Sequence, residues 1–227
     1  MKTTNNSAHL QEVLTHLRTV KGSVPIHRQA SKRPYAFSGL PFIAQLEIWD
    51  ELWHTQNDFW VRLHAYFFLE RHIKKESELL AMWPVILQWQ EQVDDWGLCD
   101  ALAKIYTKIL EVQPEAVYKQ LQQWNASKNL WKRRQSVVSL LYYSRTKKFF
   151  LTFDQVIKLI GRLLPDKEYY VQKGVGWALR ECHTVYPKET LAWLTPNIKK
   201  VSSIAFTICM EKMDEETKNA LKASRKL

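Results

Sequence analysis

Trp96 and Asp100 are the pair of side chains in this sequence whose types and spacing best suit chemistry on a cation. They stand four residues apart in the stretch DDWGLCD, residues 94–100, so a helix would project them from one face, one turn apart. A fixed carboxylate stabilises a developing positive charge, and an indole packs against a flat or sugar-like group. The plainer interpretation is a surface acid beside a core tryptophan, so the pair must be judged with the elements that position it.

Those elements are predicted to be helices throughout. Apolar residues recur with helical spacing and no segment shows sustained period-two alternation, so no strand is predicted. Asn57 or Asp58, Asp94 or Asp95, and Thr152 are suited to cap helix N-termini. The predicted helices span 9–20, 40–54, 59–72, 76–93, 96–112, 114–124, 128–143, 152–164, 166–186, 187–194, 202–213 and 215–223. Residues 27–35 are expected to form an irregular basic link, either a solvated loop or an arm that contacts phosphates.

The helix starts repeat along the chain. Polar residues open comparable segments at positions 57, 94, 128 and 167, which are 37, 34 and 39 residues apart. This is the period of two-helix HEAT-like repeats, which stack into a curved solenoid. The sequence therefore predicts an all-α fold: a right-handed α-solenoid of HEAT-like helical repeats with a concave basic groove, forming a single domain over residues 1–227.

The repeat alignment gathers further polar groups at one phase. Counted from each start, the seventh residue is Leu63, Asp100, Arg134 and Lys173. On the last of these helices Lys173, Trp177 and Arg180 share a face. Basic groups interleaved with aromatics are typical of a nucleic-acid surface. Plainer roles stay open, namely Trp96 and Trp177 as core residues and Arg134 as the partner of a helix carboxylate.

The overall charge agrees with an anionic partner. Lys and Arg number 33 against 23 acids, a formal charge of +10, which favours nucleic acid or an anionic membrane surface. A membrane role would need a long apolar run or a basic amphipathic helix with a clean apolar face, and the sequence offers neither. The N-terminus is polar and lacks an apolar signal core, and the three cysteines are unpatterned. We therefore expect free, buried thiols and a cytoplasmic protein.

No metal and no cofactor are predicted. The seven histidines form no His-Glu-x-x-His motif, and no cysteine pairs with a histidine at zinc spacing. A metalloenzyme is therefore disfavoured, and we expect a monomer that acts through its own side chains.

Three motifs carry a family resemblance: DWGLCD at 95–100, WKRR at 131–134 and VQKGVGWALRE at 171–181. In this order and spacing they resemble the AlkD family of HEAT-like-repeat DNA alkylation repair enzymes, the alkylpurine DNA glycosylases. The resemblance covers roughly residues 37–181, and its last motif is the most specific. It implies that Asp100 is the catalytic carboxylate and that Trp96 and Trp177 are the two site tryptophans. Arg134 would hold the DNA backbone beside the lesion.

The resemblance also implies the reaction. The expected activity is base excision repair of double-stranded DNA, with hydrolysis of the N-glycosidic bond of cationic N3- or N7-alkylated purines. Asp100 would stabilise the oxocarbenium-like sugar, and Lys173, Arg180 and Arg133 would join Arg134 in binding DNA. The alternative is a non-catalytic HEAT-repeat scaffold that binds DNA or protein. That alternative predicts a disrupted site, whereas the carboxylate, both tryptophans and the arginine are present.

Overall fold

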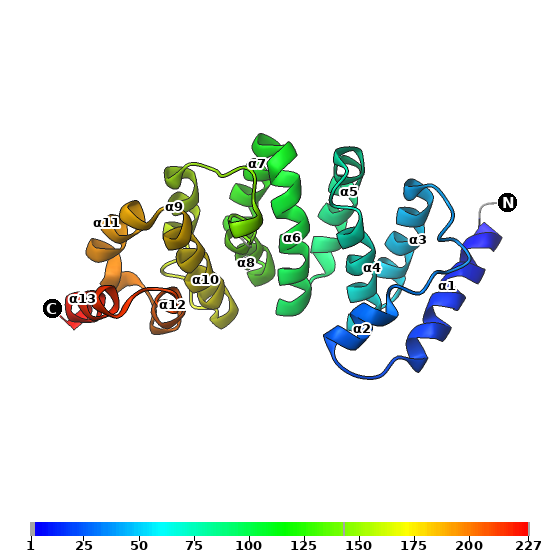
Figure 1. Cartoon of the computed structure of the whole chain (residues 1–227), viewed down its shortest axis with the longest axis horizontal. Coiled ribbons are helices and arrows are strands. Elements are labelled where there is room, and N and C mark those ends of the chain that lie inside the picture. Colours follow the sequence, from blue (N-terminus) through cyan, green and yellow to red (C-terminus); the bar gives the residue numbers. More distant parts are fainter. Residues whose placement is uncertain (1–2, 143, 227) are drawn as a thin grey trace. The chain divides into compact units, whose positions relative to one another are not determined.

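A computed structural model describes residues 3–142 and 144–226, and this part of the chain is helical without strands (Figure 1). The all-α prediction is confirmed. The helices are α1 Thr3–Thr19, α2 Val24–Ala30, α3 Phe42–Thr55, α4 Phe59–Arg71, α5 Glu76–Trp89, α6 Trp96–Val112, α7 Pro114–Asn125, α8 Leu130–Val138, α9 Phe153–Arg162, α10 Tyr169–Val185, α11 Pro187–Asn197, α12 Ser203–Cys209 and α13 Glu215–Lys226. Three short 3₁₀ turns accompany them: η1 Gln90–Gln92, η2 Ser144–Thr146 and η3 Ile198–Lys200.

The chain forms two compact units, Met1–Asp94 and Asp95–Leu227. In the first unit, α3 packs against α4 and α5, and α1 packs against α3 and α4. Its core is aromatic: the rings of Trp53 and Trp89 stack with centroids 4.3 Å apart, and both side chains are fully buried. The first unit is therefore a packed body with its own core.

The second unit contains every residue predicted to act on DNA. Helices α6, α8, α10 and α12 pack one beside the next, and α7 and α9 contact each other and α8. Neighbouring helices thus cover one another's apolar faces, as stacked helical repeats require. Helices α4, α6, α8 and α10 begin 37, 34 and 39 residues apart, so the predicted repeat spacing is confirmed. The single domain over 1–227, the handedness and the concave groove stay predictions.

Helix starts agree with the sequence better than helix ends. The side chain of Asp95 accepts hydrogen bonds from the backbone N–H groups of Gly97 and Leu98, so α6 begins where predicted. Thr152 caps α9 in a reciprocal capping box. A capping side chain bonds to backbone groups only two or three residues away, so the start of a helix can be predicted from the local sequence.

The predicted bounds differ from the structure in several places. The helix expected over 9–20 begins at Thr3, and the helix expected over 76–93 ends at Trp89. Three further segments differ more. The helix expected over 128–143 ends at Val138, because Leu140 and Leu141 are buried in non-helical backbone and their apolar spacing reflects burial alone. Its expected end at Tyr143 lies outside the described residues. The helix expected over 202–213 covers only Ser203–Cys209. The basic link over 27–35 is partly helical, since α2 includes His27, whose buried ring stacks on Trp60 at 3.7 Å.

Two glycines let helices approach closely in the second unit. A Cβ atom at Gly176 would lie 2.7 Å from the Ala205 carbonyl oxygen and 2.8 Å from its Cα, so α10 and α12 touch backbone to backbone there. A Cβ atom at Gly174 would lie 3.2 Å from Cγ of Arg134. Gly174 therefore leaves the space through which the Arg134 side chain crosses α10.

The three cysteines, Cys99, Cys182 and Cys209, are free and buried. Burial raises the pKa of the Cys99 thiol well above its usual value, that of Cys182 to about 11 and that of Cys209 to about 12. The expected free, buried thiols are confirmed, and they stay protonated at neutral pH.

Candidate functional site

The N-terminal part of α6 presents Trp96 and, one turn later, Asp100 at the surface of the second unit. The apolar residues Leu98, Cys99 and Leu102 of the same helix are fully buried, so the opposite side of the turn faces outward. Trp96 is the more exposed of the two: the residue is 51 % exposed, whereas the Asp100 side chain is 31 % exposed. The predicted pair is therefore accessible and is not a core tryptophan beside a surface acid.

Asp100 is held by the Arg134 guanidinium of α8. Its Oδ1 accepts from Nη2 at 2.7 Å and from Nε at 3.2 Å, and its Oδ2 accepts from Nη2 at 3.0 Å. The remaining nitrogen, Nη1, donates to the Tyr170 carbonyl oxygen at 2.7 Å. Arg134 is only 6 % exposed, and all three of its guanidinium nitrogens bond to protein acceptors. In this structure it orients a carboxylate, and its role in contacting phosphate stays a prediction.

The electrostatics of Asp100 are a balance of opposing effects. Burial raises the pKa of the Asp100 carboxyl above its usual value, whereas the neighbouring Arg134 and, at greater distance, Lys173 work to lower it. The charge of Asp100 therefore depends on its arginine partner. The repeat phase that grouped Asp100, Arg134 and Lys173 is confirmed for the first two by direct contact.

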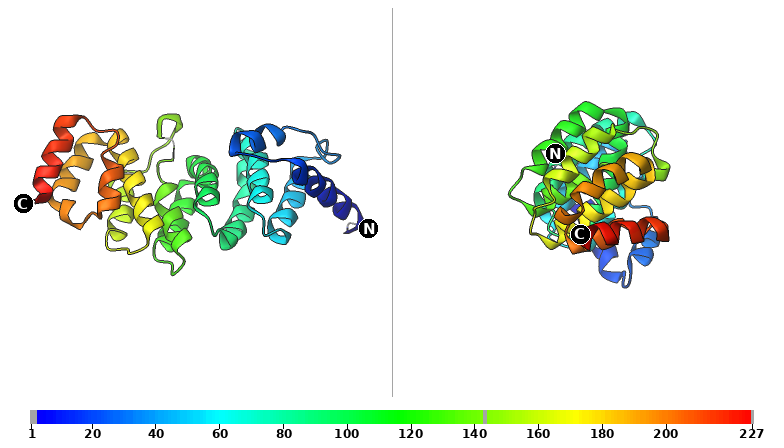
Figure 2. Two further views of the ribbon diagram at one scale, coloured as in Figure 1. Left: turned by 90° about the horizontal axis from the view of Figure 1, so that it is seen from below. Right: turned by 90° about the vertical axis from the view of Figure 1, so that its left-hand side faces the viewer.

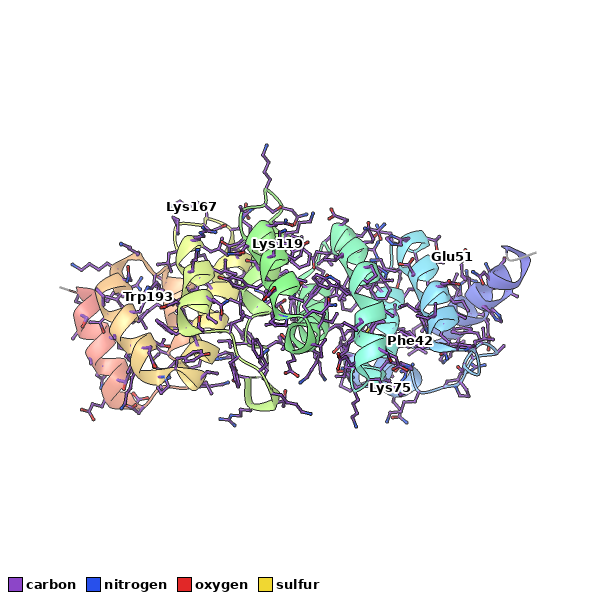
Figure 3. All side chains as sticks on the ribbon, turned by 90° about the horizontal axis from the view of Figure 1, so that it is seen from above. Phe42, Glu51, Lys75, Lys119, Lys167 and Trp193 are labelled. Atoms are coloured by element: carbon purple, nitrogen blue, oxygen red, sulfur yellow. The ribbon has the colours of Figure 1, made fainter. Side chains whose placement is uncertain are left out.

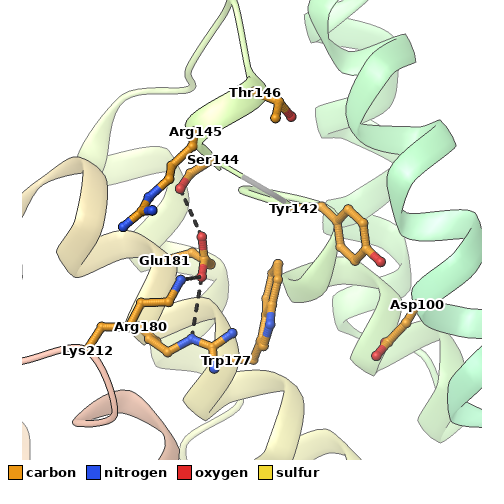
Figure 4. A pocket seen from close by; sticks show the side chains of 9 residues that line it. All are labelled: Asp100, Tyr142, Ser144, Arg145, Thr146, Trp177, Arg180, Glu181 and Lys212. Atoms are coloured by element: carbon orange, nitrogen blue, oxygen red, sulfur yellow. Dashed lines mark hydrogen bonds and ion pairs between the residues drawn. The ribbon is translucent and has the colours of Figure 1, made fainter.

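An open pocket of about 520 Å³ lies beside this carboxylate. Its lining residues are Asp100, Tyr142, Ser144, Arg145, Thr146, Trp177, Arg180, Glu181 and Lys212. Trp177 of α10 lies against Tyr142 with ring centroids 5.4 Å apart, and in Figure 4 its indole stands between Asp100 and the charged groups around Glu181. Trp96 is not part of this lining, although it lies one turn from Asp100.

A second carboxylate, Glu181, forms the far wall of the pocket. It is 3 % exposed and accepts hydrogen bonds from Ser144 Oγ at 2.9 Å and Lys212 Nζ at 2.6 Å. Burial alone would raise the pKa of Glu181, but these hydrogen bonds outweigh it and hold the pKa below its usual value. Glu181 was not among the site residues predicted from the sequence. The signal was available, because Trp177 and Glu181 are four residues apart on α10, as Trp96 and Asp100 are on α6.

The other predicted DNA-binding residues differ in how far they are free to bind. Arg133 donates to Asp166 at 2.6 Å and to the carbonyl oxygens of Ser127 and Lys128, so it holds the turn after α7. Arg180 pairs with Glu211 and lies 3.4 Å from Glu181. Lys173 has no carboxylate partner within the described residues; its ammonium lies 5.4 Å from the centre of the Tyr169 ring.

The sequence of this chain matches a known protein family. The model of the DNA alkylation repair enzyme family matches residues 6–213. The chain belongs to this family. The match spans both compact units, and it includes all three motifs on which the resemblance rested.

Solved structures of similar fold carry related names. AlkD2 from Streptococcus mutans has a TM-score of 0.65 and 19 % identity, with 92 % of this chain and 99 % of that chain covered. A predicted DNA alkylation repair enzyme from Enterococcus faecalis also has a TM-score of 0.65, with 15 % identity over 94 % of this chain and 97 % of that one. At these identities the likeness concerns the fold. No curated protein matches the sequence.

None of the helices in residues 3–142 and 144–226 is both long and apolar enough to cross a membrane. No group of three or more His, Cys, Asp or Glu residues in the described part of the chain is arranged to hold a metal ion.

Proposed function

We propose that this member of the repair family is a DNA glycosylase that hydrolyses the N-glycosidic bond of N3- and N7-alkylated purines in duplex DNA. The observation that carries the proposal is an oriented carboxylate beside an aromatic wall: Asp100 is fixed by Arg134 at a pocket that also contains Trp177. Such a site offers one anion and one indole face to whatever enters it.

The chemistry of the lesion matches what the site offers. An N3- or N7-alkylpurine is cationic, so the glycosidic C–N bond breaks with its electron pair moving to the base, which leaves neutral. The deoxyribose is left with oxocarbenium-like positive charge until water adds to C1′ and loses a proton. Stabilisation is therefore needed beside the sugar rather than at the base. One carboxylate suffices, in contrast to the paired acids of ordinary glycosidases.

Asp100 is the group proposed to stabilise that charge. Its Oδ1 accepts two hydrogen bonds from Arg134 and its Oδ2 accepts one, so Oδ2 keeps more capacity for the sugar cation and for the attacking water. Because Arg134 fixes the carboxylate before substrate arrives, little reorganisation is needed at the moment of reaction. Arg134 thus acts as a positioning residue for Asp100.

The two tryptophans supply the apolar contacts. Trp177 in the pocket wall is proposed to pack against the deoxyribose, and its electron-rich face favours positive charge beside it. Trp96, exposed one turn before Asp100, would cover the same sugar or the flanking base from the α6 side. Each contact contributes about 0.5–2 kcal/mol, less than the oriented anion.

Base release from DNA treated with a methylating agent tests the proposal. Asp100→Asn keeps the size of the side chain but removes the anion, so we expect the rate to fall by about 10²–10³. Affinity for intact DNA should hold or improve, because a carboxylate near phosphates repels them. Asp154→Asn, an exposed acid on α9 outside the pocket, is the matched control and should release base at the wild-type rate.

Two outcomes would contradict the proposal in different ways. If Asp100→Asn released 7-methylguanine as fast as wild type, Asp100 would not be the catalytic carboxylate. If the wild type released no alkylated base, the chain would be a binding scaffold.

A further inference from the structure

The pocket contains a cation that none of the three motifs includes. Arg145 lies in η2, is exposed and lines the pocket. Among the described residues its guanidinium has no hydrogen-bond or ion-pair partner. By contrast, Arg180 and Lys212 on the same wall pair with Glu211 and Glu181. Arg145 is therefore the uncommitted positive charge of the pocket.

We propose that Arg145 binds a backbone phosphate of the DNA strand whose sugar enters the pocket. The inference rests on the proposed function, because a nucleotide is what brings phosphate there. A deoxyribose placed against Trp177 has a phosphate on each side, so the pocket must accept an anion next to the sugar. Asp100 and Glu181 on its walls repel that anion, and a guanidinium with free N–H groups attracts it bidentately.

The backbone around Arg145 is fixed even though its side chain is free. Ser144 is held by its hydrogen bond to buried Glu181. The Thr146 carbonyl oxygen accepts from Lys108 Nζ at 3.1 Å, and the backbone N–H of Lys148 donates to Glu111 Oε1 at 3.1 Å. Residues 144–148, here called the pocket strap, are thus pinned on both sides of Arg145.

The position of the pocket strap also suits phosphate binding by Arg145. It belongs to the segment between α8 and α9 that projects from the helical stack of the second unit (Figure 2, left). Figure 4 shows Arg145 above Glu181, on the other side of the Trp177 indole from Asp100. A phosphate bound to Arg145 would therefore be kept away from the catalytic anion. This arrangement assigns phosphate binding and charge stabilisation to opposite walls.

Binding to a short labelled duplex that contains one stable abasic-site analogue tests the inference without turnover. Arg145→Gln should raise Kd about tenfold, the usual effect of losing a hydrogen bond to a charged group. It should also reduce the slope of log Kd against log salt by about 0.9, the value for one phosphate contact. Arg162→Gln is the matched control, because Arg162 is an exposed arginine of the same unit outside the pocket. It should change both quantities less than Arg145→Gln does, because its charge would act on the DNA only at long range.

A chemical change in the DNA locates the contact. Replacing single phosphates near the analogue by neutral methylphosphonates should weaken wild-type binding most at one position. At that position Arg145→Gln should lose no further affinity, whereas Arg162→Gln should respond as wild type does. Arg145→Lys, which restores the charge, should recover part of the affinity.

The results separate this inference from the glycosylase proposal. Unchanged Kd and slope in Arg145→Gln, or additive losses at every methylphosphonate position, would overturn the phosphate contact even if the wild type excises bases. An Arg145-dependent contact in a protein that releases no base would instead support the phosphate contact and overturn the glycosylase proposal.

Discussion

At the residue scale, the central feature is that Asp100 and Arg134 form a hydrogen-bonded ion pair. The guanidinium contacts both carboxylate oxygens and is buried beneath them. An arginine in that position affects both the orientation and the ionisation of its partner. Replacing Arg134 should therefore change the pH dependence of catalysis as well as its rate.

The pH prediction has a definite sign. In the proposed mechanism Asp100 acts as an anion, so the rate of base release should fall as pH falls through the pKa of its carboxyl. Arg134 lowers that pKa, opposing the effect of burial. In Arg134→Ala the pKa of Asp100 rises, and the acid limb of the rate profile should begin at higher pH. Arg134→Lys keeps the positive charge but cannot make the bidentate hydrogen bonds of a guanidinium. The acid limb of this variant should therefore move less than that of Arg134→Ala, while its rate of base release still falls.

The same variants distinguish the two roles considered for Arg134. A shifted acid limb with an unchanged salt dependence of DNA binding is the result that a positioning role predicts. An unshifted limb together with a flatter salt dependence would show direct phosphate contact instead. Rate profiles over pH and binding titrations over salt are the two measurements.

Residue types, helical spacing and the family motifs indicated Asp100, Trp96 and Trp177 but did not indicate what surrounds them. The repeat phase brought Arg134 to Asp100 correctly, because helices of one period place equivalent positions side by side. Glu181 was missed, since a glutamate after an arginine resembles an ordinary helix ion pair. Its burial under Ser144 and Lys212 depends on tertiary contacts that no local pattern contains.

At the element scale, the contact between α10 and α12 determines where Trp177 and Glu181 lie. Gly176 sits at that contact with the backbone of Ala205 against it. Because helix backbone cannot move aside like a flexible side chain, adding a methyl group there must separate the helices. Gly176→Ala should lower stability by about 1–3 kcal/mol, seen as a lower midpoint in thermal or denaturant unfolding.

Gly161 provides the control for that prediction. It lies in α9, and a Cβ atom there would meet only the Trp193 side chain, at 3.4 Å. Alanine is the better helix former, so Gly161→Ala should leave stability unchanged or raise it by up to about 1 kcal/mol. Equal midpoints for the two variants would contradict the packing argument.

Helix starts were predictable and the pocket strap was not, for a physical reason. Asp95 and Thr152 act on backbone groups two or three residues away, so their effect is local. The end of α8 depends instead on Leu140 and Leu141 entering the core, and on Ser144 reaching Glu181. Those contacts join distant parts of the chain, and the apolar spacing of 128–143 resembled a longer helix.

At the scale of the whole molecule, the net charge is unevenly divided. Residues 1–94 contain 10 basic and 10 acidic residues, which leaves 23 basic and 13 acidic residues in 95–227. The formal +10 of the chain is therefore the charge of the second unit, the one that contains the pocket. Exposed lysines such as Lys119 and Lys167, labelled in Figure 3, contribute to it. Composition alone gave the total and not this division.

This distribution predicts a salt-dependent affinity for DNA. Each phosphate neutralised should contribute about 0.9 to the slope of log affinity against log salt. Binding of the full chain to an unmodified duplex should therefore weaken steeply between low and physiological ionic strength. Neutralising Lys119 and Lys167 by glutamine should weaken binding more than the same change at Lys32 and Lys74 in the neutral first unit. Affinity that is indifferent to salt would contradict an electrostatic DNA surface.

The burial of the three thiols has a consequence for a protein of an alkylation repair family. Electrophilic methylating agents react with cysteine as well as with purines, and the nucleophile that attacks them is the thiolate rather than the thiol. Cys99, Cys182 and Cys209 are shielded from solvent, and their raised pKa values leave almost no thiolate at neutral pH. A protein built this way keeps its own sulfur nucleophiles out of reach of the reagents whose damage it is proposed to remove.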